Sequence, residues 1–425
     1  MDDTETVITG IGLVSALGLG KEENWAAFCA GRSGVGPVRG FDAGELPSRI
    51  ASQVPARFEA HFAARFPGAA AAPRFVQLGL AASEMAIDDA GLEFEREDRE
   101  RIAVVVGTGG AGFKLLDDHR EQAVARDPDL TWARLQRRDP PPLAALYVGG
   151  ACCASHISMF YHLTGPSFVV ATACASGAAA VAAAHDLLQL GTADAVLVGG
   201  TDAMVCPTAL LAFANLVTLS ARNHDPERAS RPFDRERDGF VMGEAAGMMI
   251  LETAAHARRR RARVYARVLG CATTSEAFNI TAPATEGAGM ARTMREAMRA
   301  ARVAPGDVDY VSAHGTATTL NDLRETQGIK RAFGDHARKL WVSSQKSMIG
   351  HSIGAAGAIE TAVTALTISE RVVTPTINYE YPDPECDLDV VPNAARERGV
   401  RVALTNSFGF GGHNTTIVLA ANGGH

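Results

Sequence analysis

Cys174-Ala-Ser-Gly-Ala-Ala179 and His351-Ser-Ile-Gly-Ala-Ala356 repeat one pattern at two distant points of the sequence. In each, a glycine follows the polar residue by three positions, two alanines come next, and an apolar stretch follows. Small residues almost all round such a stretch predict a helix that is buried on every side. The pattern suggests two related halves, with chemistry at equivalent helix starts.

Short apolar strands alternate with helical stretches around these two points, which predicts an α/β fold built in layers. The expected strands are Thr6–Ile11, Ile102–Val106, Ser167–Ala171, Ala195–Val198, Gly247–Leu251, Val308–Ala313, Leu340–Ser343, Val402–Asn406 and Thr415–Ala420. The expected helices are Phe75–Ala90, Ala175–Gln189, Gly289–Arg302, Asp322–Phe333 and Gly354–Ser369. The stretch Arg126–Pro142, with charges and then three prolines, predicts an irregular loop.

The composition is that of a globular protein with a large core, since 47% of the 425 residues are hydrophobic and 21% are charged. The net charge of −7 gives no support for nucleic-acid binding. No apolar run reaches the roughly 18 residues of a membrane span, and the acidic N-terminus is unlike a secretion signal. We therefore expect a cytoplasmic protein without a nucleic-acid or membrane partner.

The seven cysteines are odd in number, and none is spaced as Cys-x-x-Cys. This arrangement favours neither a disulfide framework nor a metal knuckle. We expect most of them to be small buried apolar residues and expect no metal site.

Cys174 is a candidate nucleophile because it lies between an expected strand and an expected helix. A thiol at a helix N-terminus has its thiolate stabilised by the helix dipole and by free N–H groups, which predicts a lowered pKa. An isolated cysteine is more often an inert core residue, but the strand–turn–helix setting favours catalysis.

His314 follows an apolar strand in Val311-Ser-Ala-His-Gly-Thr-Ala-Thr318, and His351 opens the second glycine-rich helix start. A lone histidine is usually structural, whereas two at strand and helix ends are well placed for catalysis. Lys346 would place a positive charge near His351. It is also a partner for Glu360, whose carboxylate would be costly to bury unpaired.

The segment Asn406-Ser-Phe-Gly-Phe-Gly-Gly-His-Asn414 precedes the final strand. Its glycines permit a loop with exposed N–H groups, in which Phe410 could act as an apolar gate. A simple glycine-rich turn is the alternative.

Two further motifs point to other functions. Gly107-Thr-Gly-Gly-Ala-Gly112 fits the dinucleotide pattern G-x-G-x-x-G, but no strand ending in an acidic residue follows, so a close-packing turn is expected. Gly350-His-Ser-Ile-Gly354 fits the nucleophile elbow of a serine hydrolase, with Ser352, Asp389 and His413 in the required order. The preceding strand ends too early for that elbow, so a hydrolase remains the alternative enzyme class.

Taken together, these segments resemble the β-ketoacyl-acyl-carrier-protein synthases of the elongating Cys-His-His type, which act in fatty-acid and type II polyketide synthesis. The resemblance runs from Val7-Ile-Thr-Gly-Ile-Gly-Leu13 to Leu419. It includes Ser230-Arg-Pro-Phe-Asp234, Arg237-Asp-Gly-Phe240 and Pro375-Thr-Ile-Asn378. It implies a thiolase-like fold of two βαβαβαββ halves in five layers (α-β-α-β-α), here residues 1–260 with Cys174 and 261–425 with His314 and His351.

The resemblance implies a decarboxylative Claisen condensation of an acyl-Cys174 thioester with malonyl-acyl-carrier protein. His314 and His351 would promote decarboxylation, and Lys346 with Glu360 would orient them. The N–H groups of Cys174 and Phe410 would form the oxyanion hole. Substrate-binding positions would be Thr316, Thr318, Gly110, Phe213, Phe408 and Gly411. No cofactor is expected beyond the phosphopantetheine of the carrier. A catalytically silent scaffold homologue is the alternative, although it would lack one of the three catalytic residues.

Members of this family are normally dimers, so we expect a homodimer or a heterodimer with a chain-length-factor-like homologue. Ala69–Ala72 and Val217 stand where members often carry basic residues that meet the carrier protein. Arg137 and Arg138 match a basic pair and are the expected docking residues. Gly110 stands where many members have a bulky aliphatic residue, which predicts a roomier or differently shaped acyl pocket.

Overall fold

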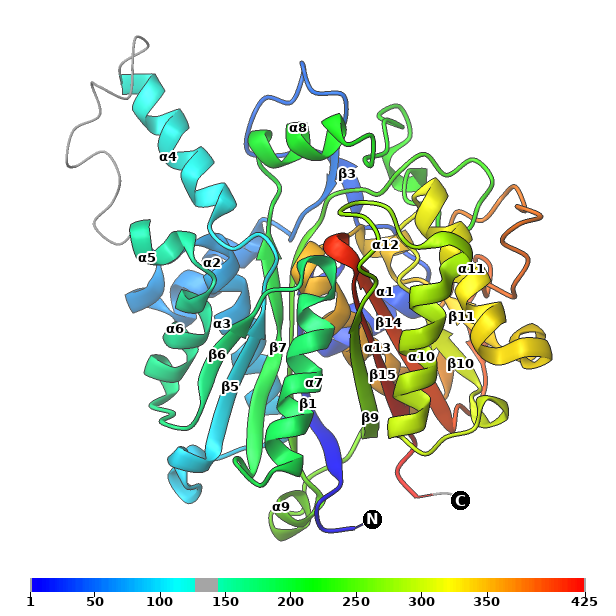
Figure 1. Cartoon of the computed structure of the whole chain (residues 1–425). Coiled ribbons are helices and arrows are strands. Elements are labelled where there is room, and N and C mark those ends of the chain that lie inside the picture. The colour runs from blue at the N-terminus through cyan, green and yellow to red at the C-terminus, as the bar shows by residue number, and fades with distance from the viewer. Residues whose placement is uncertain (1, 127–143, 424–425) are drawn as a thin grey trace.

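A computed structural model of the protein describes residues 2–126 and 144–423 (Figure 1). Its strands form two units with the same order. The first unit runs β1 (Thr6–Ser15), β8 (Glu244–Thr253), β7 (Ala195–Ala203), β5 (Ile102–Gly107) and β6 (Ser167–Val170). The second runs β9 (Ala266–Ser275), β15 (His413–Ala420), β14 (Val402–Gly409), β10 (Tyr310–Ser312) and β11 (Trp341–Ser343).

Strand directions repeat as well as strand order. In each unit the first two pairings are antiparallel and the last two are parallel. The units join where Thr6–Ile8 of β1 pairs with Ala266–Val268 of β9. The division predicted at residue 260 falls between helix α9 (Ala254–Arg259) and β9. This shared order is the two-half architecture that the sequence predicted.

The helices complete the layers. Helices α7 (Ser176–Gln189) and α13 (Ala356–Glu370) pack against each other between the two strand units. On the outer faces lie α3 (Arg74–Ala90) with α6 (Ala151–Tyr161), and α10 (Ala288–Ala300) with α11 (Thr319–Phe333), as Figure 1 shows. The result is the five-layered, thiolase-like arrangement.

Glycine and alanine make the central helix pair possible. A Cβ atom at Gly177 would lie 2.7 Å from the amide nitrogen of Ala358, and one at Gly357 would lie 2.8 Å from that of Ala178. Every residue of α13 from Ala356 to Ile368 is buried. The composition of the two helix starts therefore sets how closely the two halves approach.

The remaining described elements are short or lie at the periphery. They are β2 (Gly18–Leu19), α1 (Lys21–Cys29), β3 (Val35–Pro37), β4 (Ile50–Ser52), α2 (Arg57–Arg65), α4 (Phe113–Arg126), α5 (Ala144–Val148), α8 (Pro207–Asn215), α12 (Lys346–Ile349), β12 (Val372–Val373) and β13 (Arg396–Glu397). The sequence predicted none of these short elements. Strand β10 is shorter than predicted, because the 3-10 turn Pro305–Asp307 runs up to Val308. The predicted loop lies outside the described residues after Arg126.

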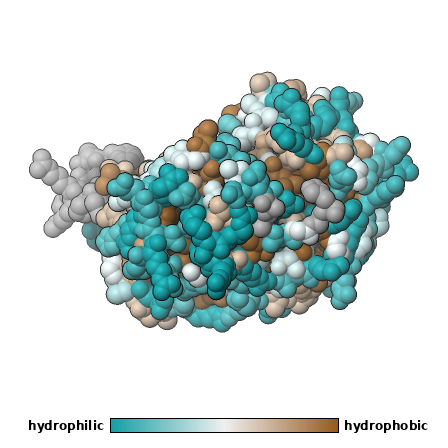
Figure 2. Space-filling model, turned by 90° about the horizontal axis from the view of Figure 1, so that it is seen from below, coloured by the Kyte–Doolittle hydropathy of each residue, from teal (hydrophilic) through white to brown (hydrophobic). Residues whose placement is uncertain are grey.

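The parallel strands direct their carboxyl ends toward one region. Cys174 follows β6, His314 follows β10, Lys346 and His351 follow β11, and Phe410 follows β14. The ends of parallel strands are where α/β proteins place their ligand sites. On the face seen from below, where both chain ends lie, hydrophilic residues predominate (Figure 2).

All seven cysteines are free, and five of them are buried, which fits their predicted role as small apolar residues. No helix in the described ranges combines the length and the hydropathy that a bilayer span needs.

Candidate active site

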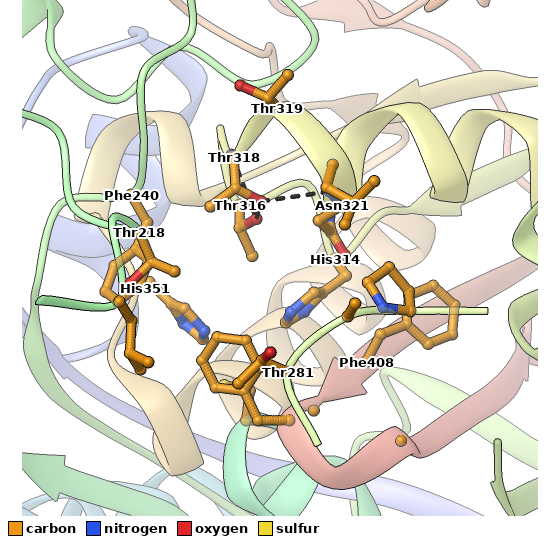
Figure 3. Close-up of a pocket in the computed structure, with 18 of the residues that line it drawn as sticks. Thr218, Phe240, Thr281, His314, Thr316, Thr318, Thr319, Asn321, His351 and Phe408 are labelled. Atoms are coloured by element: carbon orange, nitrogen blue, oxygen red, sulfur yellow. Dashed lines mark hydrogen bonds between the residues drawn. The ribbon is translucent and has the colours of Figure 1, made fainter. Parts of the chain in front are cut away.

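A cavity of about 340 Å³ lies where these strand ends meet. Figure 3 shows the rings of His314 and His351 directed into it from opposite sides. Its lining also includes Cys174, Thr316, Thr318, Phe408, Phe410 and Gly411. The structure thus brings together the three predicted catalytic residues from both halves of the chain.

Cys174 lies in a 3-10 turn, Ala173–Ala175, that leads into α7. The turn is held by Ser176, whose hydroxyl donates to the carbonyl of Ala173 at 2.6 Å and accepts from the amide of Thr172 at 2.9 Å. Ala173 itself has a positive φ of 51°, a strained conformation for a residue with a Cβ atom. This local strain presents the thiol to the cavity.

Burial raises the pKa of the Cys174 thiol to about 11. The charge of Lys346 and the N–H groups of Phe410 and Cys174 act in the opposite direction. The predicted lowering of this pKa by the helix N-terminus is therefore wrong, because only 6% of the residue is exposed and desolvation outweighs the local dipole. The resting nucleophile is a thiol.

The two N–H groups predicted to form the oxyanion hole converge on the Cys174 sulfur. The Phe410 amide is placed by the turn Phe410–Gly412, in which Gly411 has φ 82° and donates to the carbonyl of Ile280 at 2.7 Å. A Cβ atom at Gly409 would lie 3.2 Å from the amide nitrogen of Cys174. Because Gly409 has no side chain, this loop can approach Cys174 closely.

The two histidine rings lie edge to face, with centroids 5.4 Å apart. The pKa of each is lowered well below 6.5, first by burial and then by the charge of Lys346. Both imidazoles are therefore neutral at pH 7. Neither ring nitrogen of His351 has a partner among the described residues, so this side chain is free to meet a ligand atom in the cavity.

Lys346 contacts His314 rather than His351. Its ammonium group donates to the carbonyl oxygen of His314 at 2.7 Å and lies 3.3 Å from Nδ1 of the same residue. Because an ammonium group only donates, this contact favours the His314 tautomer with its proton on Nε2. The predicted positive charge of Lys346 near His351 is present, since it helps to lower the pKa of that ring, while its hydrogen bonds go to His314.

The predicted Lys346–Glu360 pair is present as a buried ion pair, with both side chains 1% exposed. Burial raises the pKa of Glu360 to about 7, although Lys346 opposes this shift. Together with the hydrogen bond to the carbonyl of His314, the pair anchors the loop that carries this histidine.

The loop of His314 has a second carboxylate anchor that sequence reasoning missed. Glu325 on α11 accepts the amide N–H groups of His314 and Gly315, each at 2.8 Å. Asn406 also donates to it, at 3.3 Å. The sequence did contain a signal, since Glu325 is an acidic residue on the apolar face of the predicted helix Asp322–Phe333. A buried carboxylate that accepts backbone N–H groups explains its place there.

The predicted substrate-binding residues divide into two groups. Thr316, Thr318, Phe408 and Gly411 line the cavity, and the two threonine hydroxyls are 2.9 Å apart. Phe213 and Gly110 do not line it. Phe213 stacks on Phe410 with ring centroids 6.4 Å apart. Arg137 and Arg138, the predicted docking residues, lie outside the described part of the chain.

Gly110 does not by itself open a space. A Cβ atom there would lie 2.1 Å from the sulfur of Met204, which occupies the volume that a larger residue would take. Met204 is buried in the same apolar cluster as Cys174 and Ile353. The predicted enlargement of the acyl pocket is therefore offset by this methionine.

The two misleading motifs have structural explanations. The N–H groups of Gly109, Gly110 and Ala111 in the dinucleotide-like motif all donate to the carboxylate of Asp202, so an internal anion occupies this turn. Around the hydrolase motif, Ser352 has no hydrogen-bond partner among the described residues. The Asp389 carboxylate instead pairs with Arg396. No Ser–His–Asp relay joins these side chains in the described structure.

Comparison with known protein families gives matches over most of the chain. Residues 3–257 match the model of the beta-ketoacyl synthase N-terminal domain, and residues 265–380 match that of the C-terminal domain. A 3-oxoacyl-acyl-carrier-protein synthase 2 from Synechocystis sp. is 40% identical over 419 residues, covering 99% of this chain and 98% of the relative.

Solved structures give the same result. A ketosynthase in complex with its type II polyketide-synthase acyl-carrier protein is similar with a TM-score of 0.88 and 31% identity, over 99% of this chain and 100% of that one. The ishigamide ketosynthase/chain length factor is similar with a TM-score of 0.89 and 33% identity, over 99% of each chain.

Proposed function

Since this chain belongs to the β-ketoacyl synthase family, we propose that it condenses an acyl group held on Cys174 with malonyl-acyl-carrier protein. The products are β-ketoacyl-acyl-carrier protein and carbon dioxide, as in fatty-acid elongation or type II polyketide synthesis. The observation that carries this proposal is the shared cavity, in which a buried thiol meets two neutral imidazoles and two converging N–H groups.

In the first step the Cys174 sulfur attacks the thioester carbonyl of an acyl-carrier protein. The tetrahedral oxyanion accepts hydrogen bonds from the N–H groups of Cys174 and Phe410. The bond to the carrier sulfur then breaks, and the carrier thiol leaves with the proton that Cys174 gave up. A neutral imidazole in the cavity can relay that proton. The exchange of one thioester for another is nearly balanced in energy, so the step needs no external energy source.

In the second step malonyl-carrier protein enters the same cavity. Its bond to the terminal carboxylate breaks, carbon dioxide leaves, and the electron pair forms an enolate. The thioester oxygen of that enolate accepts hydrogen bonds from Nε2–H of His314 and from the His351 ring. Neutral donors are suited to this task because they stabilise the oxyanion without protonating the carbon. The carbanion attacks the carbonyl of acyl-Cys174, and the bond from that carbonyl to the Cys174 sulfur breaks. The released Cys174 thiolate takes up one proton from water and returns to the thiol.

We propose that no metal or organic cofactor is needed, since every bond change above uses side chains, backbone N–H groups and the carrier's own arm. Thr316 and Thr318 lie along the cavity in positions suited to hydrogen bonds with a phosphopantetheine arm. The seven free cysteines suit a reducing compartment, which supports a cytoplasmic location.

The carrier protein has to dock at the mouth of this cavity, and the mouth has an apolar rim (Leu216, Val217, Phe278, Ile280 and Leu320). Leu216, Val217 and Leu320 line the cavity itself, and the other two flank the lining residue Asn279. Val217 is 88% exposed and Ile280 is 76% exposed. The charged residues of the described lining are Asp238 and Glu276, with no lysine or arginine.

We therefore propose that the carrier docks mainly through apolar contacts at this rim. Because salt screens charges but not apolar contacts, the KM for the carrier should change less than about twofold between roughly 0.05 and 0.5 M NaCl. A steep rise of KM with salt would instead assign docking to a basic surface such as the one predicted at Arg137 and Arg138.

The first strand unit ends in an open edge that supports dimer formation. Strand β6 is last in its sheet and pairs only with β5 among the described strands. Phe168 on this strand and Met159 and Phe160 on the neighbouring α6 are exposed apolar residues. An unpaired edge beside apolar side chains favours strand addition from a second chain. We propose a homodimer through β6; a heterodimer with a chain-length-factor-like homologue is the alternative.

The test is intact mass after the protein is mixed with acyl-carrier proteins of several chain types. Wild type should gain the mass of one acyl group, and Cys174→Ala should gain none. Addition of malonyl-carrier protein should then remove the acyl group and give a β-ketoacyl-carrier product. Persistence of the acyl-enzyme in the presence of malonyl-carrier protein would argue against the condensation.

A further inference from the structure

Asp202 is a buried carboxylate close to the reacting groups that the steps above do not use. It lies near the end of β7 and has no exposed surface. Its hydrogen-bond partners among the described residues include no lysine or arginine. Five donors bind it instead: the Thr108 hydroxyl at 2.7 Å and the amides of Gly109, Gly110, Ala111 and Gly354 at 2.8, 3.0, 3.2 and 2.7 Å.

The four amide donors favour an ionised carboxylate, because an amide N–H cannot accept a hydrogen bond. Burial raises the pKa of Asp202, while the Thr108 hydroxyl and the amides act against that rise. A protonated oxygen would have to point a hydrogen at a group that also donates. Both carboxylate oxygens accept hydrogen bonds: Oδ1 from Thr108, Gly110 and Ala111, and Oδ2 from Gly109 and Gly354.

The donors belong to both halves of the chain. Thr108–Ala111 follows β5 in the first half, whereas Gly354 lies in the second half, three residues after His351. The loop lies between the two catalytic turns, since a Cβ atom at Gly109 would be 3.1 Å from the carbonyl oxygen of Ala173 and 2.8 Å from Cγ2 of Ile353. Ala173 directly precedes the nucleophile.

We propose that Asp202 is a positioning residue for carbon–carbon bond formation, because its carboxylate ties Gly354, after His351, to the loop Thr108–Ala111, and this loop lies against the turn that carries Cys174. This inference rests on the condensation proposed above. Decarboxylation requires the histidines and the malonyl group, which both lie on the second-half side. Bond formation requires in addition that the enolate lies within reach of acyl-Cys174, and that distance depends on the relation between the two turns.

Loss of the hydrogen bonds to Asp202 should uncouple decarboxylation from carbon–carbon bond formation. When the enolate is misplaced, its carbon takes a proton from water instead of attacking acyl-Cys174. Malonyl-carrier protein then gives carbon dioxide and acetyl-carrier protein, and the acyl group stays on the enzyme. A displacement of about 1 Å can cost a factor of about 100 in such a reaction.

The test uses Asp202→Asn, which keeps the shape of the side chain but leaves one acceptor oxygen and turns an NH₂ group toward amide donors. The acylated enzyme is mixed with malonyl-carrier protein, and mass spectrometry measures acetyl- and β-ketoacyl-carrier products. We expect the rate of β-ketoacyl formation to fall about 100-fold. The share of acetyl-carrier product should rise, and the extent of Cys174 acylation should stay unchanged.

The matched control is Glu252→Gln, which alters another buried carboxylate in the same strand unit, bound to Arg260 and His256 rather than to the catalytic turns. It should lower the thermal midpoint yet keep the wild-type product ratio. The proposal is overturned if Asp202→Asn also keeps that ratio. If Asp202→Asn does not fold, Thr108→Val removes one of the five donors and should shift the ratio in the same direction, and an unchanged ratio in that folded variant also overturns it.

Failure of the proposed condensation would look different, since wild type itself would then form no β-ketoacyl product. Failure of the positioning role leaves wild-type condensation intact and the variants' product ratios unaltered.

Discussion

The Lys346 ammonium group lies 3.3 Å from Nδ1 of His314 and donates a 2.7 Å hydrogen bond to the carbonyl oxygen of that same residue. One cation therefore fixes both the backbone and the ring tautomer of a catalytic histidine. It also forms an ion pair with Glu360, in which both side chains are 1% exposed. In the condensation proposed above, the buried ion pair would orient the Nε2–H group of His314 toward the enolate.

Replacement of Lys346 by methionine should abolish this orientation. We expect malonyl decarboxylation, measured as released carbon dioxide, to fall about 100-fold. The free energy of unfolding should fall by about 3–5 kcal/mol, because Glu360 is left buried without its partner. The double variant Lys346→Met/Glu360→Leu should recover much of the stability but none of the activity. Recovery of decarboxylation in the double variant would contradict the orienting role.

Val217 combines high exposure with a strained backbone. Its φ is 55°, a conformation that a β-branched residue adopts only at a cost of about 1–3 kcal/mol. Val217→Gly should therefore raise the thermal midpoint while it removes an apolar contact for the carrier and increases the carrier KM. Steady-state kinetics and thermal unfolding measure the two effects. Val217→Ala, which keeps the strain, should raise KM without the gain in stability.

His256 links stability to pH. Its ring contacts Glu252 and lies 2.9 Å from Glu97, and these partners raise its pKa against the effect of burial. A raised folded pKa contributes stability that is fully present below the unfolded value of about 6.5 and is lost as pH rises through the folded value. His256→Gln should therefore destabilise the protein by about 3 kcal/mol at pH 6 and by less at pH 9. Urea unfolding at both pH values measures this, and an equal loss would argue against a charged imidazole.

Glu252 has the opposite pH dependence. Its pKa is lowered to about 2, with hydrogen bonds from Arg260 and His256 outweighing burial. A depressed pKa contributes stability that is present above the unfolded value near 4.5 and is lost as pH falls toward 2. The same unfolding series extended to acid should show this loss in wild type and a smaller loss for Glu252→Gln, in which only the remaining carboxylates titrate.

The pair Gly110 and Met204 should control the space behind the nucleophile. Gly110→Leu places a side chain where the Met204 sulfur lies, so it should cost about 1–3 kcal/mol. Adding Met204→Ala should restore stability. Met204→Ala alone should open a cavity beside Cys174 and extend the range of acyl chains that the enzyme accepts, as intact mass would show. An unchanged chain preference would mean that other residues set the limit.

The residues that meet in the candidate site could largely be predicted from sequence, because they stand in local patterns. Cys174 and His351 open two similar helices, and His314 ends a strand, so their types and settings already pointed to catalysis. The direction of the Cys174 pKa shift could not be predicted that way. The dipole argument uses only the local helix, whereas the decisive desolvation comes from residues distant in sequence.

The missed carboxylates have the same physical explanation. Asp202 accepts hydrogen bonds from residues 94 and 152 positions away, and Asn406, one of the donors to Glu325, lies 81 positions away. The sequence around Asp202 and Glu325 does not indicate that these distant residues donate to them. Sequence proximity indicated the charge of Lys346 near His351 but not its hydrogen bonds to His314, because these depend on β10 and β11 lying side by side.

The glycine and alanine residues between α7 and α13 have a consequence for how this site tolerates change. They set the thickness of the contact between two pseudo-equivalent helices, one of which begins next to the nucleophile and the other near His351. A single methyl group added at Gly177 would push against the backbone of the opposite helix. It would move acyl-Cys174 away from the enolate held near His351 without touching either substrate. The glycines and alanines between α7 and α13 therefore act as a spacer. The alignment of the two reacting groups depends on them as much as on the residues of the site.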